Sequence, residues 1–153
     1  MQSISLNGLS GTPVTIETHL SRGLRAFHMV GLPDASVKES KERVRSAIEQ
    51  SGFSFPRYRV TVNLAPACVK KEGTMFDAAI ALSILEANGD ITRPNNKTTP
   101  FVFGELGLQG EWRALPGMIV AAAAAKDHGA EEIILPLQNV SEAGLVRGLR
   151  LIA

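Results

Sequence analysis

The feature that most limits how this chain can fold is the run from Ala78 to Ala87, which is apolar on nearly every side. A helix with one apolar stripe can lie on a surface, but a helix that is apolar all round must be enclosed by other elements. Residues 59–66 precede it with alternating polar and apolar side chains and end at a proline, which is typical of a β-strand. We therefore expect a helix over 74–87 to be the most buried helix and to pack against a sheet.

The loop between this strand and this helix is the first candidate for function. Thr74 is expected to cap the helix, with Asp77 as the acidic half of a capping box. A glycine-bearing loop that leads into the free N–H groups of a helix start can also bind an anion or form an oxyanion site. The pattern alone leaves both interpretations open: a well-capped core helix, or an anion site around Gly73.

The composition indicates one ordinary globular domain, 1–153. Of the 153 residues, 44% are hydrophobic and 20% charged, which is enough to form a core unaided. Sixteen basic and fifteen acidic side chains leave a formal charge of +1, so nucleic-acid binding would need a local basic patch. The single cysteine, Cys68, excludes an internal disulfide and is expected to be a buried thiol. Because the start lacks a signal-peptide pattern and no apolar run could span a bilayer, we expect a cytoplasmic protein without membrane contact.

Strands and helices are predicted on both sides of the apolar helix. Residues 12–20 and 25–30 alternate with period two around a short turn and are expected to form a β-hairpin. That register would place Glu17 opposite His28, with His19 beside it; a solvated cross-strand pair is the commoner arrangement, and no metal site is expected. The other predicted elements are a helix capped by Asp34 over 34–50, a hairpin over 101–115, a helix over 118–128, a strand over 132–136, a short helix over 139–146 and an edge strand over 149–152.

Two groups of basic residues are candidates for binding the phosphates of nucleic acid. One group lies along the strand from residue 57 and just after its end. The other forms a row on the helix over 34–50, where acidic neighbours also allow the simpler interpretation of a solvated helix face. The candidate nucleic-acid-binding residues are Arg57, Arg59, Lys70, Lys71, Lys38, Lys41 and Arg45.

Several catalytic motifs are absent from the sequence. It has no Gly-x-x-x-x-Gly-Lys-Ser/Thr loop, so these residues are not expected to hold a nucleoside triphosphate or hydrolyse ATP. It also has no Gly-x-Ser-x-Gly elbow, no zinc-type Cys/His spacing and no His-Glu-x-x-His. We therefore expect no cofactor in this chain, and the residues alone predict only a compact α+β domain with one notable loop.

Longer motifs occur at residues 30–34, 37–45, 62–67, 71–73, 104–106 and 134–136. Together they resemble the N-terminal domain of one known family, the magnesium-chelatase-like AAA+ proteins of the ComM (YifB) type. The resemblance implies a single Lon-protease-like domain whose parent protein continues into an AAA+ ATPase module that is absent here. ATP and magnesium would bind that module, which would be the partner of this domain, and the full-length protein would form a homo-hexamer. The family is linked to branch migration in transformation and to recombination, so DNA is an expected partner.

The same domain resembles the proteolytic domain of Lon and the C-terminal domain of RadA, which implies a two-layer α+β sandwich with a mixed sheet, shared with a small-subunit ribosomal protein. In Lon-type peptidases a serine and a lysine form the catalytic dyad, and their positions fall on Met75 and Ile119 of this sequence. A thioether is not an alkoxide nucleophile and isoleucine offers no base, so no enzyme is expected. The leading expectation is a non-catalytic accessory domain that assists DNA binding or hexamer assembly. A protein-binding module without DNA contact is the alternative, and a Lon-like Ser-Lys peptidase is a remote one.

Overall fold

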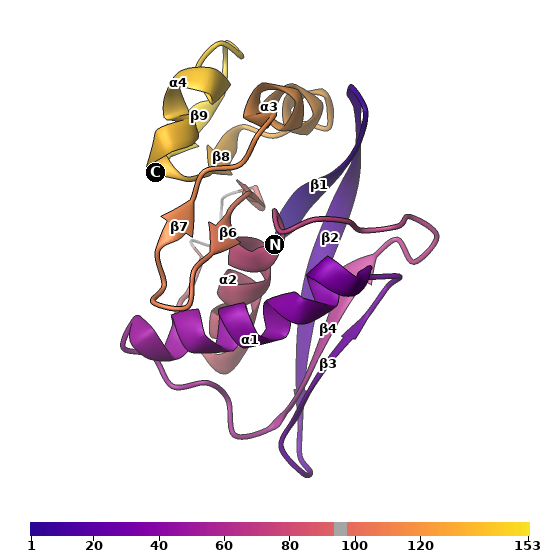
Figure 1. Cartoon of the computed structure of the whole chain (residues 1–153), viewed down its shortest axis with the longest axis vertical. Helices are drawn as coiled ribbons and strands as arrows, with labels where there is room; N and C mark the ends of the chain where they lie inside the picture. The colour runs from indigo at the N-terminus through magenta and orange to yellow at the C-terminus, as the bar shows by residue number, and fades with distance from the viewer. Residues whose placement is uncertain (94–97) are drawn as a thin grey trace.

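The computed structural model describes residues 1–93 and 98–153. Figure 1 shows a long twisted sheet with helices α1 and α2 against its lower half, and helices α3 and α4 at its upper end. The strands are β1 (Gln2–Asn7), β2 (Ser10–Ser21), β3 (Ala26–Val30), β4 (Arg59–Ala65), β5 (Phe101–Val102), β6 (Glu105–Leu106), β7 (Trp112–Arg113), β8 (Glu132–Ile134) and β9 (Arg150–Ile152). The helices are α1 (Ala35–Gln50), α2 (Asp77–Asn88), α3 (Met118–Asp127) and α4 (Val140–Ala143), with a 3₁₀ turn, η1 (Leu137–Asn139).

The main sheet is mixed, with the order β3-β4-β2-β1-β5-β8-β9 among the described residues. Strand β2 is antiparallel to both of its neighbours, β1 and β4, whereas β3 runs parallel to β4. Strands β5, β8 and β9 are parallel to one another. The predicted α+β class with a mixed sheet is therefore confirmed, and β9 is an edge strand as expected.

The predicted hairpin between 12–20 and 25–30 is wrong, because β4 lies between β2 and β3. Both strands present an apolar face with period two, and β4 supplies a third such face with Val60, Val62 and Leu64 all buried. A pattern with period two shows that a strand needs a partner but does not say which strand that partner is. The short connection after Ser21 therefore crosses over β4 instead of forming a tight turn.

Two hydrophobic clusters lie on opposite faces of the sheet. Successive side chains of a strand point to opposite faces, and Phe101 and Phe103 belong to one cluster while Val102 belongs to the other. The first cluster lies under α1 and α2, which together form the helical layer of the predicted two-layer arrangement. The second cluster lies under α3 at the end of the sheet formed by β1, β5 and β8.

Helix α2 is the enclosed helix that the sequence predicts. Eight of its residues are buried: Asp77, Ala78, Ala79, Ile80, Ala81, Ser83, Ile84 and Leu85. Its predicted capping is wrong, because the helix begins at Asp77 and no side chain bonds its first N–H groups. The Thr74 hydroxyl instead donates to the Glu105 carboxylate at 2.5 Å. Asp77 accepts from the Arg43 guanidinium, and this ion pair takes the carboxylate away from the helix start.

The other predicted elements agree with the structure more closely. Helix α1 begins after Asp34, whose carboxylate accepts from the Val37 N–H at 2.8 Å, as predicted. Strands β6 and β7 form the predicted second hairpin, although β5 joins the main sheet instead. Strand β1 and its hairpin with β2 were not predicted. Cys68 is exposed, so the prediction of a buried thiol is wrong: it lies in an open loop after β4, outside both clusters. None of the helices in the described part of the chain has the length and hydropathy to cross a bilayer.

Candidate nucleic-acid interface

The predicted basic residues along β4 do not form one surface. Arg57 and Arg59 lie where β4 begins, and Lys70 follows some residues after β4 ends. The seven residues of β4 separate its two ends by about 20 Å. Lys70 is exposed and forms an ion pair with Glu72, so the positive charge of Lys70 is largely neutralised by its neighbour. Arg57 and Arg59 therefore lie near one end of β4, and Lys70 and Lys71 lie beyond the other end.

Lys71 is not a surface residue at all. Its side chain is completely buried, and its amine donates to the carbonyl of Gly31 at 2.6 Å and to the carbonyl of Pro66. Burial lowers the pKa of the Lys71 amine below its ordinary value, since no carboxylate compensates for the lost water. The assignment of Lys71 to a phosphate-binding surface is therefore wrong. The hydrogen bonds of the Lys71 amine instead hold the loop after β4 against the loop before α1.

The predicted basic row on α1 lies along the β3 edge of the molecule. The Lys41 amine lies 6.0 Å from the centre of the Phe27 ring, and the Arg45 guanidinium lies 5.5 Å from the centre of the Phe55 ring. Arg45 also bonds Glu49 at 3.4 Å, one turn further along the helix. Such cation–π contacts at partly exposed sites stabilise by about 0.5–1 kcal/mol and hold the long side chains against the fold. Lys38, one turn earlier, is exposed.

The structure gathers arginines at the end of the sheet where β2 passes into β3. The register places Arg59 beside both Ser21 and Ala26, the last residue of β2 and the first of β3. The connection between these strands carries Arg22 and Arg25. Neither was predicted to bind nucleic acid, because the connection was expected to be the ordinary turn of a hairpin. We call this group the basic end; it consists of Arg22, Arg25, Arg57 and Arg59, all exposed.

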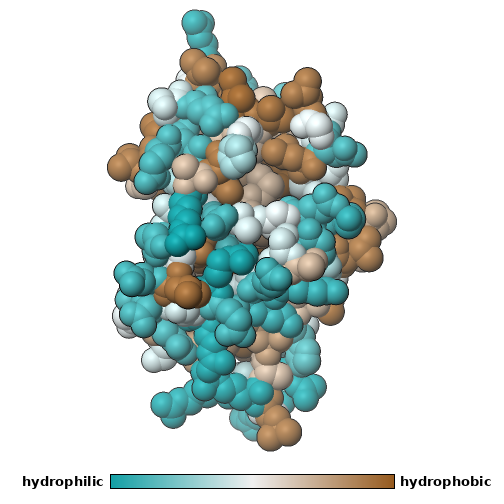
Figure 2. Space-filling view, in the orientation of Figure 1, coloured by the Kyte–Doolittle hydropathy of each residue, from teal (hydrophilic) through white to brown (hydrophobic). Residues whose placement is uncertain are grey.

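The basic end has little negative charge around it. Arg25 lies 3.8 Å from Glu49, and within the described part of the chain the other three arginines have no carboxylate within 4.0 Å. Figure 2 shows hydrophilic residues over much of the lower half of the molecule, across α1 and the ends of β2 and β3, while hydrophobic residues are more frequent around α3 and α4. The positive charge is thus local, which the net charge of +1 does not reveal.

The possible metal ligands of the sheet are kept apart by β4. Glu17 lies opposite Asn63, whose side-chain amide donates to the Glu17 carboxylate at 3.1 Å. His19 and His28 both lie beside Thr61, one on each side of it. Among the residues that the structure describes, no group of three His, Cys, Asp or Glu side chains is placed to hold a metal ion. These residues form a polar sheet face.

The two positions that match the Lon dyad line different cavities. Met75 is half-buried and lines a cavity of about 200 Å³ with Leu6 and Leu115. Ile119 is 37% exposed on α3 and lines an open cavity of about 480 Å³ between α3 and the β1–β2 turn. Neither cavity includes the other residue.

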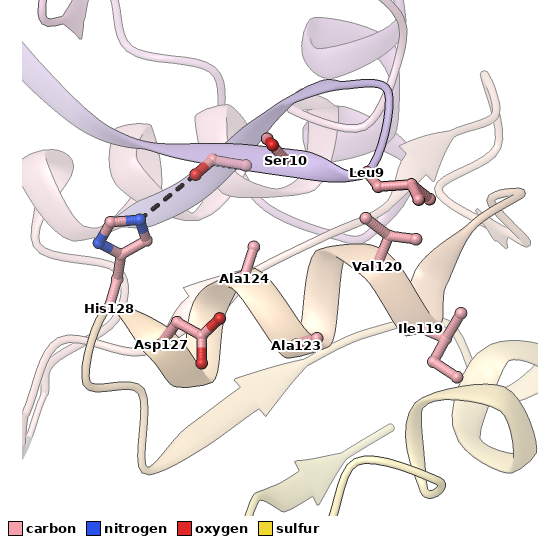
Figure 3. Close-up of a pocket in the computed structure, with 9 residues that line it drawn as sticks. Leu9, Ser10, Ile119, Val120, Ala123, Ala124, Asp127 and His128 are labelled. Carbon is pink, nitrogen blue, oxygen red and sulfur yellow. Dashed lines mark hydrogen bonds between the residues drawn. The ribbon is translucent and has the colours of Figure 1, made fainter.

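The cavity beside Ile119 contains a serine, a histidine and an aspartate, but they do not form a catalytic arrangement. Figure 3 shows the His128 ring turned toward the β2 backbone, where its Nε2 lies 3.3 Å from the carbonyl oxygen of Gly11. In the described structure no hydrogen bond links Ser10, His128 and Asp127 to one another. A nucleophile needs a base within hydrogen-bond reach. The contact between the His128 ring and Gly11 therefore connects α3 to β2, and in the described structure the ring is not placed to activate the Ser10 hydroxyl.

A buried ion pair joins the helical layer to the second hairpin. Asp77 is 1% exposed and accepts from Arg43 Nε at 2.7 Å, from Arg43 Nη2 at 3.1 Å and from the Leu106 N–H at 3.3 Å. Burial raises the pKa of the Asp77 carboxyl, and the guanidinium and the N–H oppose that effect because they stabilise the carboxylate. Both carboxylate oxygens of Asp77 accept from structural partners, and the side chain is buried, so the carboxylate is not presented to a substrate.

Comparison with known proteins places the chain in one family. The family model described as subunit ChlI of Mg-chelatase matches residues 16–139. The YifB protein of Salmonella typhimurium is 45% identical over 139 residues, which cover 91% of this chain and 27% of the relative. The competence protein ComM of Haemophilus influenzae is also 45% identical over 139 residues, with 91% and 27% covered. A Mycobacterium bovis protein is 39% identical over 147 residues, which are 96% of this chain and 29% of that relative.

The matched region contains β4, α2, α3 and both dyad positions, and extends over most of both hydrophobic clusters. The chain spans between a quarter and a third of the length of the curated relatives that it matches. It follows that this chain belongs to the magnesium-chelatase-like family described by subunit ChlI, and it is of the ComM/YifB type.

Proposed function

We propose that this chain is a non-catalytic accessory domain of an AAA+ motor that processes DNA, and that its basic end contacts the DNA backbone. The relative named competence protein ComM supports a role in handling DNA during transformation. The same proposal places the binding of ATP and magnesium in an ATPase module outside this chain. Assembly of the full-length protein into a homo-hexamer in the cytoplasm is part of the same proposal.

The observation that carries the proposal is the arrangement of the basic end. Arg22, Arg25, Arg57 and Arg59 come from separate segments, and the register of β2, β3 and β4 brings them to one end of the sheet. Arginine side chains bind phosphate oxygens without reading the bases, and such contacts dominate non-specific affinity for DNA. A single domain with few contacts would bind weakly, and several copies in one assembly would bind together much more tightly.

The absence of catalysis is supported by the chemistry at the matched positions. Met75 and Ile119 provide neither an alkoxide nor an amine, and they line separate cavities. The buried lysine nearest in sequence, Lys71, has its amine bonded to two carbonyl groups and is closed to solvent. A Lon-like peptidase is therefore not the function that we propose.

A protein-binding role without DNA is favoured by a different part of the surface. Leu137 and Leu145 are 73% and 70% exposed beside α4, and Ile152 is 36% exposed on the edge strand β9. Exposed apolar groups next to an unpaired strand edge are typical of a contact with another protein. This surface lies at the opposite end of the sheet from the basic end, so the two roles can be tested separately.

The test is fluorescence anisotropy of labelled single-stranded, duplex and forked DNA at low salt. With about four phosphate contacts, the log of the duplex binding constant should fall with the log of salt concentration with a slope near −3 to −4. The variant Arg57→Ala/Arg59→Ala should bind at least several-fold more weakly and should lower the slope by about two. The matched control is Arg113→Ala/Arg150→Ala, which removes the same charge from two other exposed strand residues.

Equal weakening by the control would show that net charge, not the basic end, determines binding. Wild-type protein that binds none of the three DNAs at high concentration would contradict the proposal and favour the protein-binding role.

A further inference from the structure

We infer that the open face of the three-stranded part of the sheet is a platform on which unpaired bases of single-stranded nucleic acid stack. This inference rests on the proposed function, because it names the form of nucleic acid that the same end of the molecule would hold. The open face is defined by three positions on each of β2, β4 and β3: Glu17, His19, Ser21, Arg59, Thr61, Asn63, Ala26, His28 and Val30.

The register fixes the arrangement of this face. His19, Thr61 and His28 lie in one row across the three strands, and Ser21, Arg59 and Ala26 lie in the next row toward the basic end. The alternate residues of the same strands, such as Leu20, Val60 and Phe27, point into the first cluster under α1 and α2. The face thus carries two histidines on either side of a threonine, on strands that lie about 10 Å apart.

No helix covers this face among the described residues. Helix α3 packs on the same side of the sheet, but only over the start of β2, where a Cβ on Gly11 would meet Ala124 at 2.5 Å. From Thr15 onward the residues of β2 on this side are exposed or nearly so, and His19, His28 and Arg59 are all exposed. A polar sheet face of this kind is accessible to a ligand as it stands.

The side chains on this face have the chemistry that unpaired bases need. Histidine rings stack on bases, and arginine guanidinium groups bind the phosphates or stack in the same way. Thr61 offers a hydroxyl group between the rings, and Ser21 and Asn63 offer a hydroxyl and an amide in the two neighbouring rows. Bases inside a duplex are hidden from a flat surface, so a sheet face with two exposed rings selects strands whose bases are free.

The charges give the platform a direction. Arg59 borders the row of histidines on one side, and the rest of the basic end continues from it. The only acidic side chain of the face, Glu17, borders the row on the other side and is bonded by Asn63. Phosphates would therefore lie toward Arg59, where attraction is strongest, and the bases would extend over His19 and His28.

The first experiment uses the histidine ring protons as reporters in proton NMR. The chain has three histidines, and His128 is a built-in control because it lies beside Gly11, about 25 Å along β2 from His19. The probes are a single-stranded oligodeoxyadenosine of about eight nucleotides and an abasic strand of equal length and charge. Stacking predicts that the His19 and His28 ring resonances move upfield with the adenine strand only, while those of His128 do not move.

The second experiment measures affinity at pH 8, above the range in which histidine side chains ordinarily titrate. His19→Ala/His28→Ala should weaken binding of single strands about ten-fold, and His19→Phe/His28→Phe should restore it, since phenylalanine also stacks. Binding of duplex should not change in either variant, because duplex depends on the basic end alone. Both positions are exposed, so circular dichroism should show the fold intact.

The outcomes separate the two proposals. If Arg57→Ala/Arg59→Ala weakens binding of all DNAs while the histidine variants change nothing, the platform is wrong and the proposed function stands. If the histidine variants weaken single-strand binding and the arginine variant does not, stacking on His19 and His28 stands, and both the basic end and the placement of the phosphates at Arg59 are wrong. Resonances that respond equally to the abasic strand contradict stacking. Resonances that shift with protein concentration alone show that a second copy occupies the face, which overturns the inference.

Discussion

Lys71 lies with its amine between two backbone carbonyls and, in the part of the chain that the structure describes, has no acidic partner, which is unusual for a buried charged side chain. Its backbone also takes part, because its N–H donates to Leu32 and its carbonyl accepts from Asp34. Leu32 itself has a φ of 61°, a left-handed conformation that is costly for a residue with a Cβ. Lys71 thus binds the loop before α1 through three separate hydrogen-bonding groups.

The lowered pKa of Lys71 predicts a specific dependence of stability on pH. Since the amine loses its proton more readily in the folded protein, the unfolded chain binds more protons between the lowered pKa and the ordinary value of 10.5. The free energy of unfolding should therefore gain a positive contribution from Lys71 as pH rises through that window. Urea titrations at several pH values should show this contribution in the wild type and not in Lys71→Met.

Lys71→Met should also lower the free energy of unfolding at neutral pH by about 1–3 kcal/mol, because two buried carbonyls lose their donor. An identical pH dependence in both proteins would contradict the assignment of Lys71 as the titrating group. The burial of Lys71 could not be predicted from the sequence, because adjacent lysines at a strand exit have the same appearance whether they point outward or inward. Arg22 and Arg25 were missed for a related reason, since only the position of β4 brings them beside the predicted Arg57 and Arg59.

At the scale of elements, local patterns predicted the helices better than the strand pairing. The capping residue Asp34, the stripe on α1 and the all-round apolar character of α2 are encoded within one helix each. The pairing of β2 with β4 depends on residues far apart in the chain, and the same alternation would suit several partners. Helix α2 starts at Asp77 and not at the predicted Thr74. The carboxylate of Asp77, which was predicted to cap the helix, is instead paired with Arg43 of a different helix.

Enclosure of α2 predicts a large cost for removing its central side chain. Ile80 is fully buried in the first cluster, so Ile80→Ala should lower the free energy of unfolding by about 2–5 kcal/mol in denaturant titrations. Leu9 is 89% exposed at the β1–β2 turn, and Leu9→Ala should change it by less than about 0.5 kcal/mol. Similar small losses for both variants would show that α2 is not enclosed.

At the scale of the whole molecule, family resemblance predicted the fold class, but neither the resemblance nor the composition located the basic end. The net charge of +1 averages over a surface on which acidic side chains neutralise some of the cations, such as Arg43, Lys70 and Arg113, and not others. At the basic end the sheet brings arginines from different segments together. The position of a charged site is therefore a property of the fold that composition cannot report.

The purified chain is expected to show neither peptidase nor ATPase activity. Casein and fluorogenic peptides test the first, and release of phosphate from ATP with magnesium tests the second. Peptidase turnover that persists in a preparation of the Met75→Ala variant would point to a contaminant or a different site. Turnover that is present in the wild type and lost in that variant would contradict the assignment of Met75 as an inactive position.

The two hydrophobic clusters have a consequence for the order in which the chain can fold during its synthesis. The first cluster contains Val14 and Ile16 from the start of the chain, but it is completed by Val102 and Leu106 and by the packing of Trp112. The second cluster takes Ile4 from β1 although its helix, α3, comes more than a hundred residues later. As the ribosome releases the chain, β1 to α2 can therefore bury most of the first cluster among themselves, since 18 of its 20 buried residues precede β5. The face of β1 that carries Ile4 stays exposed until α3 emerges.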